Sequence, residues 1–118
     1  MTITERRIGD VTLLELKGRL VFYDGAPLLR AHINELVDQA RFKFVLNLRN
    51  VTYMDSFGVG VVAAKYVSIR RKGGDVRLLS LSPRCEEVLK VSGLLRIFQT
   101  FESEEAAVAS FESPIPNP

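Results

Sequence analysis

The chain contains few of the residues that build covalent or metal cross-links. Its 118 residues include one cysteine, one histidine and no tryptophan. Cys85 cannot form a disulfide bond within the chain, and His32 with one cysteine cannot supply the ligands of a usual structural zinc site. No acidic residue stands at an obvious spacing from His32, so we interpret it as a packing residue. We expect no metal centre and no cofactor.

Long apolar runs are also missing. The longest covers residues 57–64 and contains two glycines, whereas a membrane span needs about 20 apolar residues. The N-terminal sequence has no apolar segment typical of a signal peptide. We therefore expect a cytoplasmic protein with no membrane insertion.

A strong excess of either charge is absent as well. The 16 basic and 14 acidic side chains give a net charge of +2 and are spread along the sequence. A nucleic-acid-binding domain usually carries a dense basic patch. We expect protein partners and no direct contact with nucleic acid.

What the chain does have is the composition of an ordinary globular domain, with 47% apolar and 25% charged residues. Its length allows one hydrophobic core but not two independent ones. We predict one domain over residues 1–112. The proline-rich residues 113–118 are expected to form a flexible C-terminal tail.

The hydrophobic spacing predicts strands and helices in alternation. Two strands joined by the turn pair Gly9-Asp10 come first, and Ser82 and Ser103 are expected to cap the last two helices. The predicted strands are residues 3–8, 11–16, 43–48, 76–81 and 96–101, and the predicted helices are 27–40, 57–71, one from Pro83 and one after Ser103. The inward stripes are Leu29, Ile33, Leu36, Val37 and Ala40 on the first helix, and Val59, Val62, Ala63, Tyr66 and Val67 on the second. This order predicts an α/β fold with a mixed sheet of four to five strands covered by about four helices.

Residues 51–60, Val-Thr-Tyr-Met-Asp-Ser-Phe-Gly-Val-Gly, are the candidate functional segment. They join a buried strand to a helix, and parallel sheets bind ligands beyond such strand ends. Ser56 would lie beside the unpaired N–H groups and the positive end of the helix, where an added anion is tolerated. Ser56 is therefore a candidate phosphorylation site.

The neighbours of Ser56 allow more than one interpretation. Asp55 would cap the helix, orient the Ser56 hydroxyl, or do both. Gly58 and Gly60 would permit either a partner's backbone to approach or close packing of the helix on the sheet. Asn47 is expected to satisfy buried backbone groups near the turn.

Catalysis by Ser56 is disfavoured. The sequence Asp-Ser-Phe-Gly is not the Gly-x-Ser-x-Gly motif of serine hydrolases, and His32 is poorly placed as a base. A nucleotide site would rest on Gly58-Val-Gly60 alone, which is a weak phosphate motif without a Walker lysine. We predict that the protein is not an enzyme.

The segment 45–60, Val-Leu-Asn-Leu-Arg-Asn-Val-Thr-Tyr-Met-Asp-Ser-Phe-Gly-Val-Gly, resembles the signature of STAS domains, especially of bacterial anti-sigma factor antagonists. Further segments fall in the order and spacing of that family, so that the resemblance covers roughly residues 5 to 111. They are Gly18-Arg-Leu20, Arg71-Lys-Gly-Gly74, Leu81-Ser-Pro83, Val91-Ser-Gly-Leu94 and Ser103-Glu-Glu-Ala106.

This resemblance implies a single STAS-type domain that works by partner switching. Such an antagonist binds an anti-sigma factor that is also a serine kinase, and thereby frees a sigma factor for transcription. Ser56 matches the phosphoacceptor of the family; its phosphorylation by the kinase releases the antagonist, and a serine phosphatase restores it. The implied partner surface comprises Asp55, Ser56, Phe57, Gly58, Val59, Tyr23 and Asp24, supported by Asn47 and Gly60.

Two residues depart from the family pattern. Phe57 stands where the family often has serine or threonine, and Val21 stands where many antagonists carry an acidic residue. These two residues therefore allow a kinase contact, or a kinase, that differs from the usual one of the family. The alternatives are a STAS scaffold or accessory subunit of a stress-sensing or lipid-transport complex, and a small-molecule or nucleotide-sensing STAS module.

Overall fold

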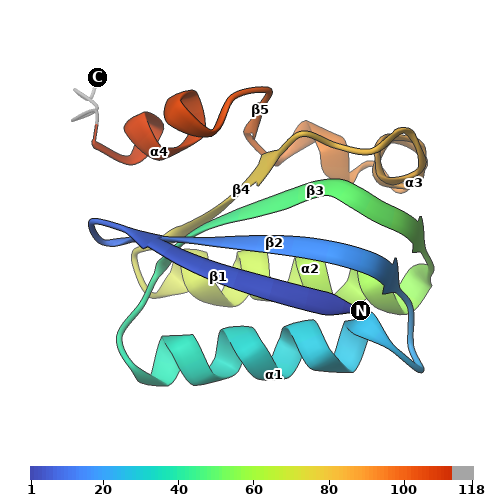
Figure 1. Ribbon diagram of the computed structural model, residues 1–118, viewed down its shortest axis with the longest axis horizontal. Helices are drawn as coiled ribbons and strands as arrows, with labels where there is room; N and C mark the ends of the chain where they lie inside the picture. Colours follow the sequence, from blue (N-terminus) through green and yellow to red (C-terminus); the bar gives the residue numbers. More distant parts are fainter. Residues whose placement is uncertain (113–118) are drawn as a thin grey trace.

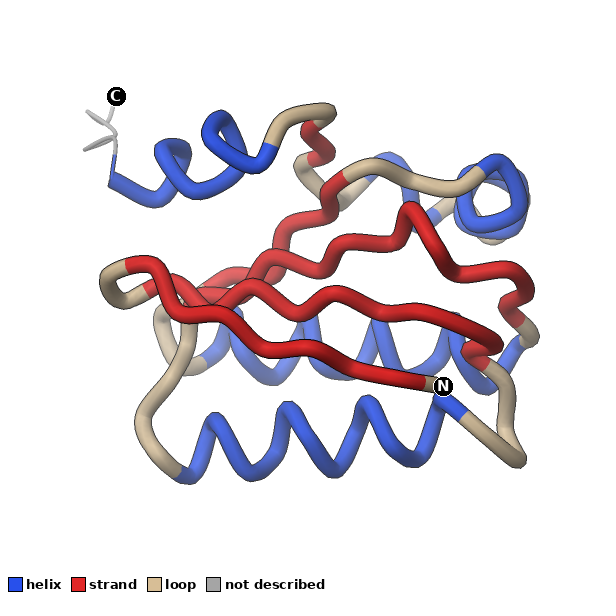
Figure 2. Tube along the Cα trace, viewed as in Figure 1, coloured by secondary structure: helices blue, strands red, loops and turns tan. Residues whose placement is uncertain are grey.

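The computed structural model describes residues 1–112 as one five-stranded sheet with helices on both faces (Figure 1). Figure 2 shows the same arrangement by element type. The elements are β1 Thr2–Ile8, β2 Val11–Leu20, α1 Gly25–Asp38, β3 Lys43–Met54, α2 Ser56–Arg71, β4 Asp75–Leu79, α3 Pro83–Val91, the 3₁₀ turn η1 Leu94–Arg96, β5 Thr100–Phe101 and α4 Glu104–Glu112. The predicted α/β class, a mixed sheet of four to five strands covered by about four helices, is confirmed. The tail predicted for 113–118 lies outside the described residues.

The strands follow one another across the sheet in the order β1-β2-β3-β4-β5. β1 and β2 form an antiparallel hairpin in which Ile8 pairs with Val11, and Gly9 adopts the positive φ of 64° that its tight turn needs. All other neighbouring strands are parallel. The carboxyl ends of β2, β3 and β4 therefore meet at one edge, where the α1, α2 and α3 helices begin.

The core has two parts, one on each face of the sheet. α1 and α2 lie side by side on one face, and α4 lies on the other (Figure 1). The larger cluster joins α1, α2 and α3 to the sheet, and the smaller one joins α4 to it. Cys85, on α3, is fully buried in the larger cluster. No helix within residues 1–112 combines the length and apolar character that crossing a bilayer requires.

β3 is longer than predicted, because the polar residues after Leu48 continue the strand instead of ending it. The pairing of β3 with β2 is irregular there: Glu15 pairs with Asn47, but Lys17 pairs with Asn50. The side-chain oxygen of Asn47 accepts a hydrogen bond from the backbone N–H of Arg49 at 3.0 Å. Asn47 therefore bonds a backbone group, as expected, but that group is exposed and lies at an irregularity within β3, not buried near the turn before α2.

The helix boundaries and the last strand differ in smaller ways. α1 ends at Asp38, and Ala40 lies outside it, exposed, with a positive φ of 63°. On α2 Val67 is 44% exposed, while Ile69 is fully buried in its place. The strand predicted over 96–101 is reduced to Thr100–Phe101, because residues 94–96 form η1 and β5 pairs with Leu78 and Leu79 alone.

His32 has an acidic partner that its helix does not reveal. Its Nε2 lies 3.1 Å from Oε1 of Glu5 on β1. This hydrogen bond, with a further one from Arg7, lowers the pKa of the Glu5 carboxyl. Sequence spacing does not reveal this acid, because β1 and α1 are brought together only by the fold.

Candidate functional site

The site is built around the first residues of α2. Met54 ends β3, Asp55 is the helix N-cap with an extended backbone, and Ser56 is the first helical residue. The Oδ1 atom of Asp55 accepts hydrogen bonds from the backbone N–H groups of Phe57 and Gly58, both at 2.9 Å. The prediction that Asp55 caps α2 is confirmed.

The same carboxylate also holds the loop between β2 and α1. Its Oδ2 atom accepts a hydrogen bond from the backbone N–H of Phe22 at 3.0 Å. The backbone N–H of Asp55 in turn points to the carbonyl oxygen of Leu20 at 3.3 Å. Asp55 therefore connects the first turn of α2 to the β2–α1 loop.

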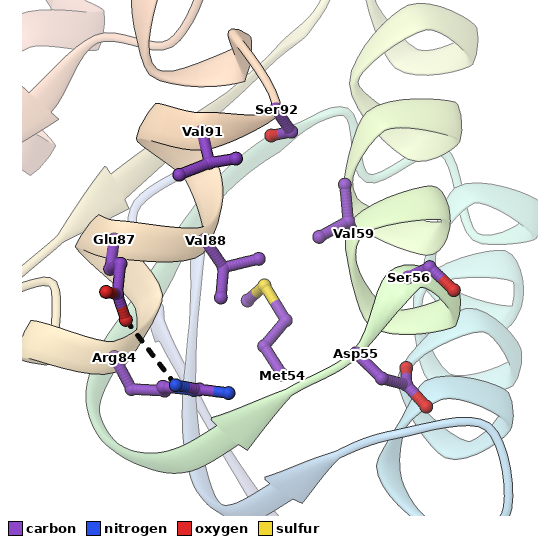
Figure 3. Close-up of a pocket in the computed structure, with 9 residues that line it drawn as sticks. All are labelled: Met54, Asp55, Ser56, Val59, Arg84, Glu87, Val88, Val91 and Ser92. Atoms are coloured by element: carbon purple, nitrogen blue, oxygen red, sulfur yellow. Dashed lines mark hydrogen bonds and ion pairs between the residues drawn. The ribbon is translucent and has the colours of Figure 1, made fainter.

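Ser56 itself is exposed. In Figure 3 its hydroxyl lies on the outer side of α2, away from Met54 and Val88. The first turn of α2 contains no acidic residue, so its positive end is offset by the Asp55 cap alone. An enzyme can reach this hydroxyl, and a phosphate there would lie close to the positive helix end.

Three exposed aromatic rings lie on the two segments that Asp55 holds, the β2–α1 loop and the first turn of α2, and form what we call the aromatic surface. Phe22, Tyr23 and Phe57 are 56%, 60% and 60% exposed. The ring centroid of Phe22 lies 5.2 Å from that of Tyr23 and 5.3 Å from that of Phe57, and the Arg19 guanidinium lies 5.3 Å from the Tyr23 ring. Exposed aromatic side chains that are held by neighbours are typical of protein-binding surfaces.

Asp24, a member of the predicted partner surface, forms an ion pair within the domain. One of its carboxylate oxygens lies 2.7 Å from the amino group of Met1, at the start of β1. Its backbone N–H donates to the carbonyl oxygen of Val21 at 3.1 Å. In this structure Asp24 positions the loop that carries Phe22 and Tyr23.

An open groove of about 480 Å³ separates the start of α2 from α3 (Figure 3). Val59 and Val88 point into it from the two helices, with Met54 at its base. Val91 at its rim is 83% exposed. The full lining of this α2–α3 groove is Met54, Asp55, Ser56, Val59, Arg84, Glu87, Val88, Val91 and Ser92.

The α3 wall of the groove was missed by sequence reasoning. Arg84 lies across the ring of Tyr53, 4.6 Å from its centroid, and pairs with Glu87 at 3.4 Å. A valine at position 91, in the last helical turn, is the one sequence signal, because that position would ordinarily be polar. The helical spacing of α3 predicts Val88 as an inward-facing residue, whereas in the structure it lines the groove.

The two glycines of the segment have different surroundings. A Cβ atom on Gly58 would lie 2.2 Å from the carbonyl oxygen of Leu20, whereas one on Gly60 would meet nothing within 4 Å. Gly58 is buried and Gly60 is exposed. Gly58 therefore permits close packing of α2 on β2, and Gly60 leaves an open backbone on the surface.

The structure does not bring Ser56 and His32 together as a hydrolase would need. His32 lies on α1 and pairs with Glu5 of β1, whereas Ser56 lines the α2–α3 groove, to which His32 does not contribute. Among residues 1–112 no group of three or more His, Cys, Asp and Glu side chains is placed to hold a metal ion.

Replacing Asp55 by alanine is expected to lower the free energy of unfolding by about 1–2 kcal/mol, because it removes the cap of α2. Asp55→Asn keeps an acceptor for Phe57 and Gly58 but places an NH₂ group opposite the N–H of Phe22. We expect Asp55→Asn to retain most of the stability and to speed hydrogen exchange at the Phe22 amide. Urea denaturation and amide exchange measure the two effects; unchanged stability in Asp55→Ala would contradict this role.

Comparisons with known proteins agree with this geometry. The sequence profile of the STAS domain matches residues 2–107. The chain is 33% identical over 116 residues to the putative anti-sigma factor antagonist BtrV of Bordetella bronchiseptica, covering 98% of this chain and 99% of that one. It is 29% identical over 103 residues to the anti-sigma F factor antagonist of Paenibacillus polymyxa, covering 86% and 87% of the two chains.

Solved structures give the same result for the fold. The anti-sigma factor antagonist SpoIIAA in its unphosphorylated form superposes with a TM-score of 0.82 at 25% identity, over 98% of this chain and 100% of that one. The phosphorylated form of SpoIIAA, described as a Bacillus cell fate determinant, gives a TM-score of 0.75 at 23% identity, over 93% and 99% of the two chains. Because the STAS domain profile matches residues 2–107 of its 118 residues, this chain belongs to the STAS domain family.

Proposed function

We propose that this protein is an anti-sigma factor antagonist that binds an anti-sigma factor serine kinase and is released when that kinase phosphorylates Ser56. The observation that carries the proposal is the exposed Ser56 hydroxyl at the positive end of α2, between the aromatic surface and the α2–α3 groove. Relatives named as anti-sigma factor antagonists support it. In this account the protein is a cytoplasmic binding module rather than an enzyme, and a serine phosphatase restores it.

The switch acts through electrostatics at the contact surface. Phosphorylation adds about −1.5 to −2 charges at pH 7, next to the carboxylate of Asp55. Within a complex this charge would have to lose its water beside Asp55 and beside exposed aromatic rings, at a cost of several kcal/mol. About 4 kcal/mol corresponds to roughly a thousandfold loss of affinity.

The fold itself is expected to tolerate the phosphate. Ser56 is exposed and takes no part in the Asp55 cap, and the helix end offsets part of the new charge by about 0.3–2 kcal/mol. Binding would therefore be lost while the domain stays folded. This separation of binding from folding is what a reversible switch requires.

The departures from the family pattern define the docking chemistry. Val21 is 2% exposed and lies inside, so no acidic side chain is presented at its position. Phe22 follows it and contacts Phe57 on the surface. We expect the kinase to meet this antagonist with a more apolar contact than in relatives that carry an acidic residue there.

Incubation with the candidate kinase and ATP tests the proposal. Intact-mass and peptide mass spectrometry should show a single stoichiometric phosphate on Ser56, and Ser56→Ala should remain unmodified under the same conditions. Stoichiometric modification at another residue, or none with a kinase that binds the protein, would refute the assignment.

A second candidate function is the binding of a small apolar molecule in the α2–α3 groove. Its open volume of about 480 Å³ and its valine and methionine side chains favour this possibility. A ligand screened by thermal shift would raise the melting temperature of the wild type, and Val88→Asp should abolish that rise. No shift across a broad panel of lipids, nucleotides and small metabolites would leave protein recognition as the function of the groove.

A further inference from the structure

A second cleft lies between the first turns of α1 and α2, the two helices that run side by side on one face of the sheet (Figure 1). Its volume is about 210 Å³, and it is lined by Phe22, Ala26, Pro27, Arg30, Phe57 and Val61. We call it the α1–α2 cleft. It shares no lining residue with the α2–α3 groove and does not include Ser56.

Residues one helical turn further along α1 and α2 extend this cleft. We call the extended surface the track; it has an apolar end at Phe57 and a cationic end at Lys65. Phe57, Val61 and Lys65 are four residues apart on α2 and share one side of that helix. On α1, Asn34 lies four residues after Arg30, which lines the cleft. The side-chain oxygen of Asn34 accepts a hydrogen bond from Lys65 Nζ. The track runs from the Phe57 ring toward cations that lie about 6 to 12 Å away, one to two helical turns.

The cations at the far end, Arg30 and Lys65, form no ion pair within residues 1–112. Among the described residues, no carboxylate lies within ion-pair distance of Arg30 or Lys65. Burial and, secondarily, the positive charge of Arg30 lower the pKa of the Lys65 ammonium. Its hydrogen-bond partner is the neutral amide of Asn34. A carboxylate placed here would neutralise two repelling charges, one of them partly removed from water.

We propose that the α1–α2 cleft binds an acidic protein segment, with one apolar side chain against Phe57 and Val61 and a carboxylate about 6 to 12 Å further along, between Arg30 and Lys65. The distance between the apolar end of the cleft and the two cations sets the spacing between the apolar side chain and the carboxylate in the bound segment. The cleft shares Phe22 and Phe57 with the aromatic surface but not Ser56. The proposal goes beyond the switch at Ser56, because it concerns a contact that needs no phosphate.

Two other occupants fit the structure less well. Anionic membranes are usually recognised by clusters of about four to eight basic residues, and this track presents Arg30 and Lys65. A second copy of this chain would offer the acidic start of α4, but the apolar residues behind it, Ala107 and Val108, are 0% and 7% exposed in their own core. The two residues one turn after that acidic start are therefore held in the core and cannot serve as the anchor.

The test uses the unmodified protein and a defined peptide. A short fluorescein-labelled peptide with one phenylalanine, followed one and two helical turns later by glutamates, is titrated with the protein by fluorescence anisotropy. An isotope-labelled sample maps the contact by amide chemical shifts. We expect a Kd of about 10 μM to 1 mM, typical of one anchor and a pair of charges, with shifts concentrated on residues 57–65 and 26–34.

Charge-reversal variants test whether Arg30 and Lys65 bind the carboxylates of the peptide. Arg30→Glu combined with Lys65→Glu should weaken peptide binding by about tenfold or more, as should replacement of the peptide glutamates by glutamines. Arg30→Gln with Lys65→Gln repeats the test should the reversal disturb folding. The matched control is Arg71→Glu with Lys72→Glu, an equal charge change at exposed residues beyond the track, which should bind like the wild type.

Several results would overturn the proposal. They are no measurable peptide binding, equal binding by the glutamate and glutamine peptides, and an equal loss in the control pair. Binding to phosphatidylglycerol vesicles but not to the peptide would assign the cations to a membrane instead. Self-association that is lost with the Arg30 and Lys65 variants would assign them to a second copy. None of these results depends on a kinase, so each leaves the proposal for Ser56 to its own test.

Discussion

Ser56→Asp is expected to bind the anti-sigma factor about 100-fold or more weakly than the wild type, whereas Ser56→Ala is expected to bind within a few-fold of it. Alanine removes an exposed hydroxyl that has no structural role in the Asp55 cap. Aspartate places a second carboxylate beside Asp55 on a surface that must lose water in the complex, which costs a few kcal/mol. Isothermal titration calorimetry with the purified partner measures both affinities.

A serine elsewhere provides the control for added charge. Ser103 is exposed and caps α4, accepting a hydrogen bond from the backbone N–H of Ala106 at 3.0 Å. Aspartate is an equally good cap, so Ser103→Asp adds one negative charge with little effect on the fold. It should bind like the wild type. Equal affinities for Ser56→Asp and Ser56→Ala would remove the electrostatic switch.

Gly58→Ala is expected to lower the free energy of unfolding by about 1–3 kcal/mol or more, the range seen when a packed interior is overfilled. Its Cβ would lie 2.2 Å from the carbonyl oxygen of Leu20, and 3.0 Å and 3.1 Å from side-chain carbons of Leu20 and Met54. Because the closest atom belongs to the backbone of β2, relief requires α2 to move away from the sheet. Chemical denaturation followed by circular dichroism measures the loss.

Gly60→Ala is the matched substitution in the same helix. A Cβ atom there meets nothing within 4 Å, and alanine favours a helix over glycine by about 0.5–1 kcal/mol. Gly60→Ala should therefore leave stability unchanged or raise it by about that amount. Similar destabilisation by both substitutions would show that α2 does not pack on β2 as described.

The movement that Gly58→Ala forces would also reach the switch. α2 begins at Ser56, and Asp55 holds both the first turn of α2 and the loop that carries Phe22. A displaced α2 would change the relative positions of Ser56 and the aromatic surface. Close packing at Gly58 thus connects the core of the domain to the geometry that a partner recognises.

The centre of the site could be predicted from sequence because its interactions are local. Asp55 contacts residues two and three positions ahead of it, so the cap follows from residue type and order. The exposure of Ser56 follows from its place at the first helical position. The hairpin at Gly9 and the cap at Ser82 were predictable for the same reason.

What could not be predicted depends on contacts between distant segments. The partner of His32 lies 27 residues away on β1, and the second oxygen of Asp55 bonds to Phe22, 33 residues away. The two walls of the groove, α2 and α3, follow different strands, β3 and β4, so their meeting depends on how the sheet is assembled. The length of β3 is set by its pairing with β2 beyond Asn47, where the polar sequence alone indicates a loop.

The most direct test of the switch follows a preformed complex in real time. The protein is bound to its anti-sigma factor kinase, ATP is added, and release is recorded by fluorescence or light scattering. The account predicts that the wild type dissociates as phosphate accumulates on Ser56, whereas Ser56→Ala stays bound with ATP and both stay bound with a non-hydrolysable analogue. A wild-type complex that persists after stoichiometric phosphorylation of Ser56 would contradict it.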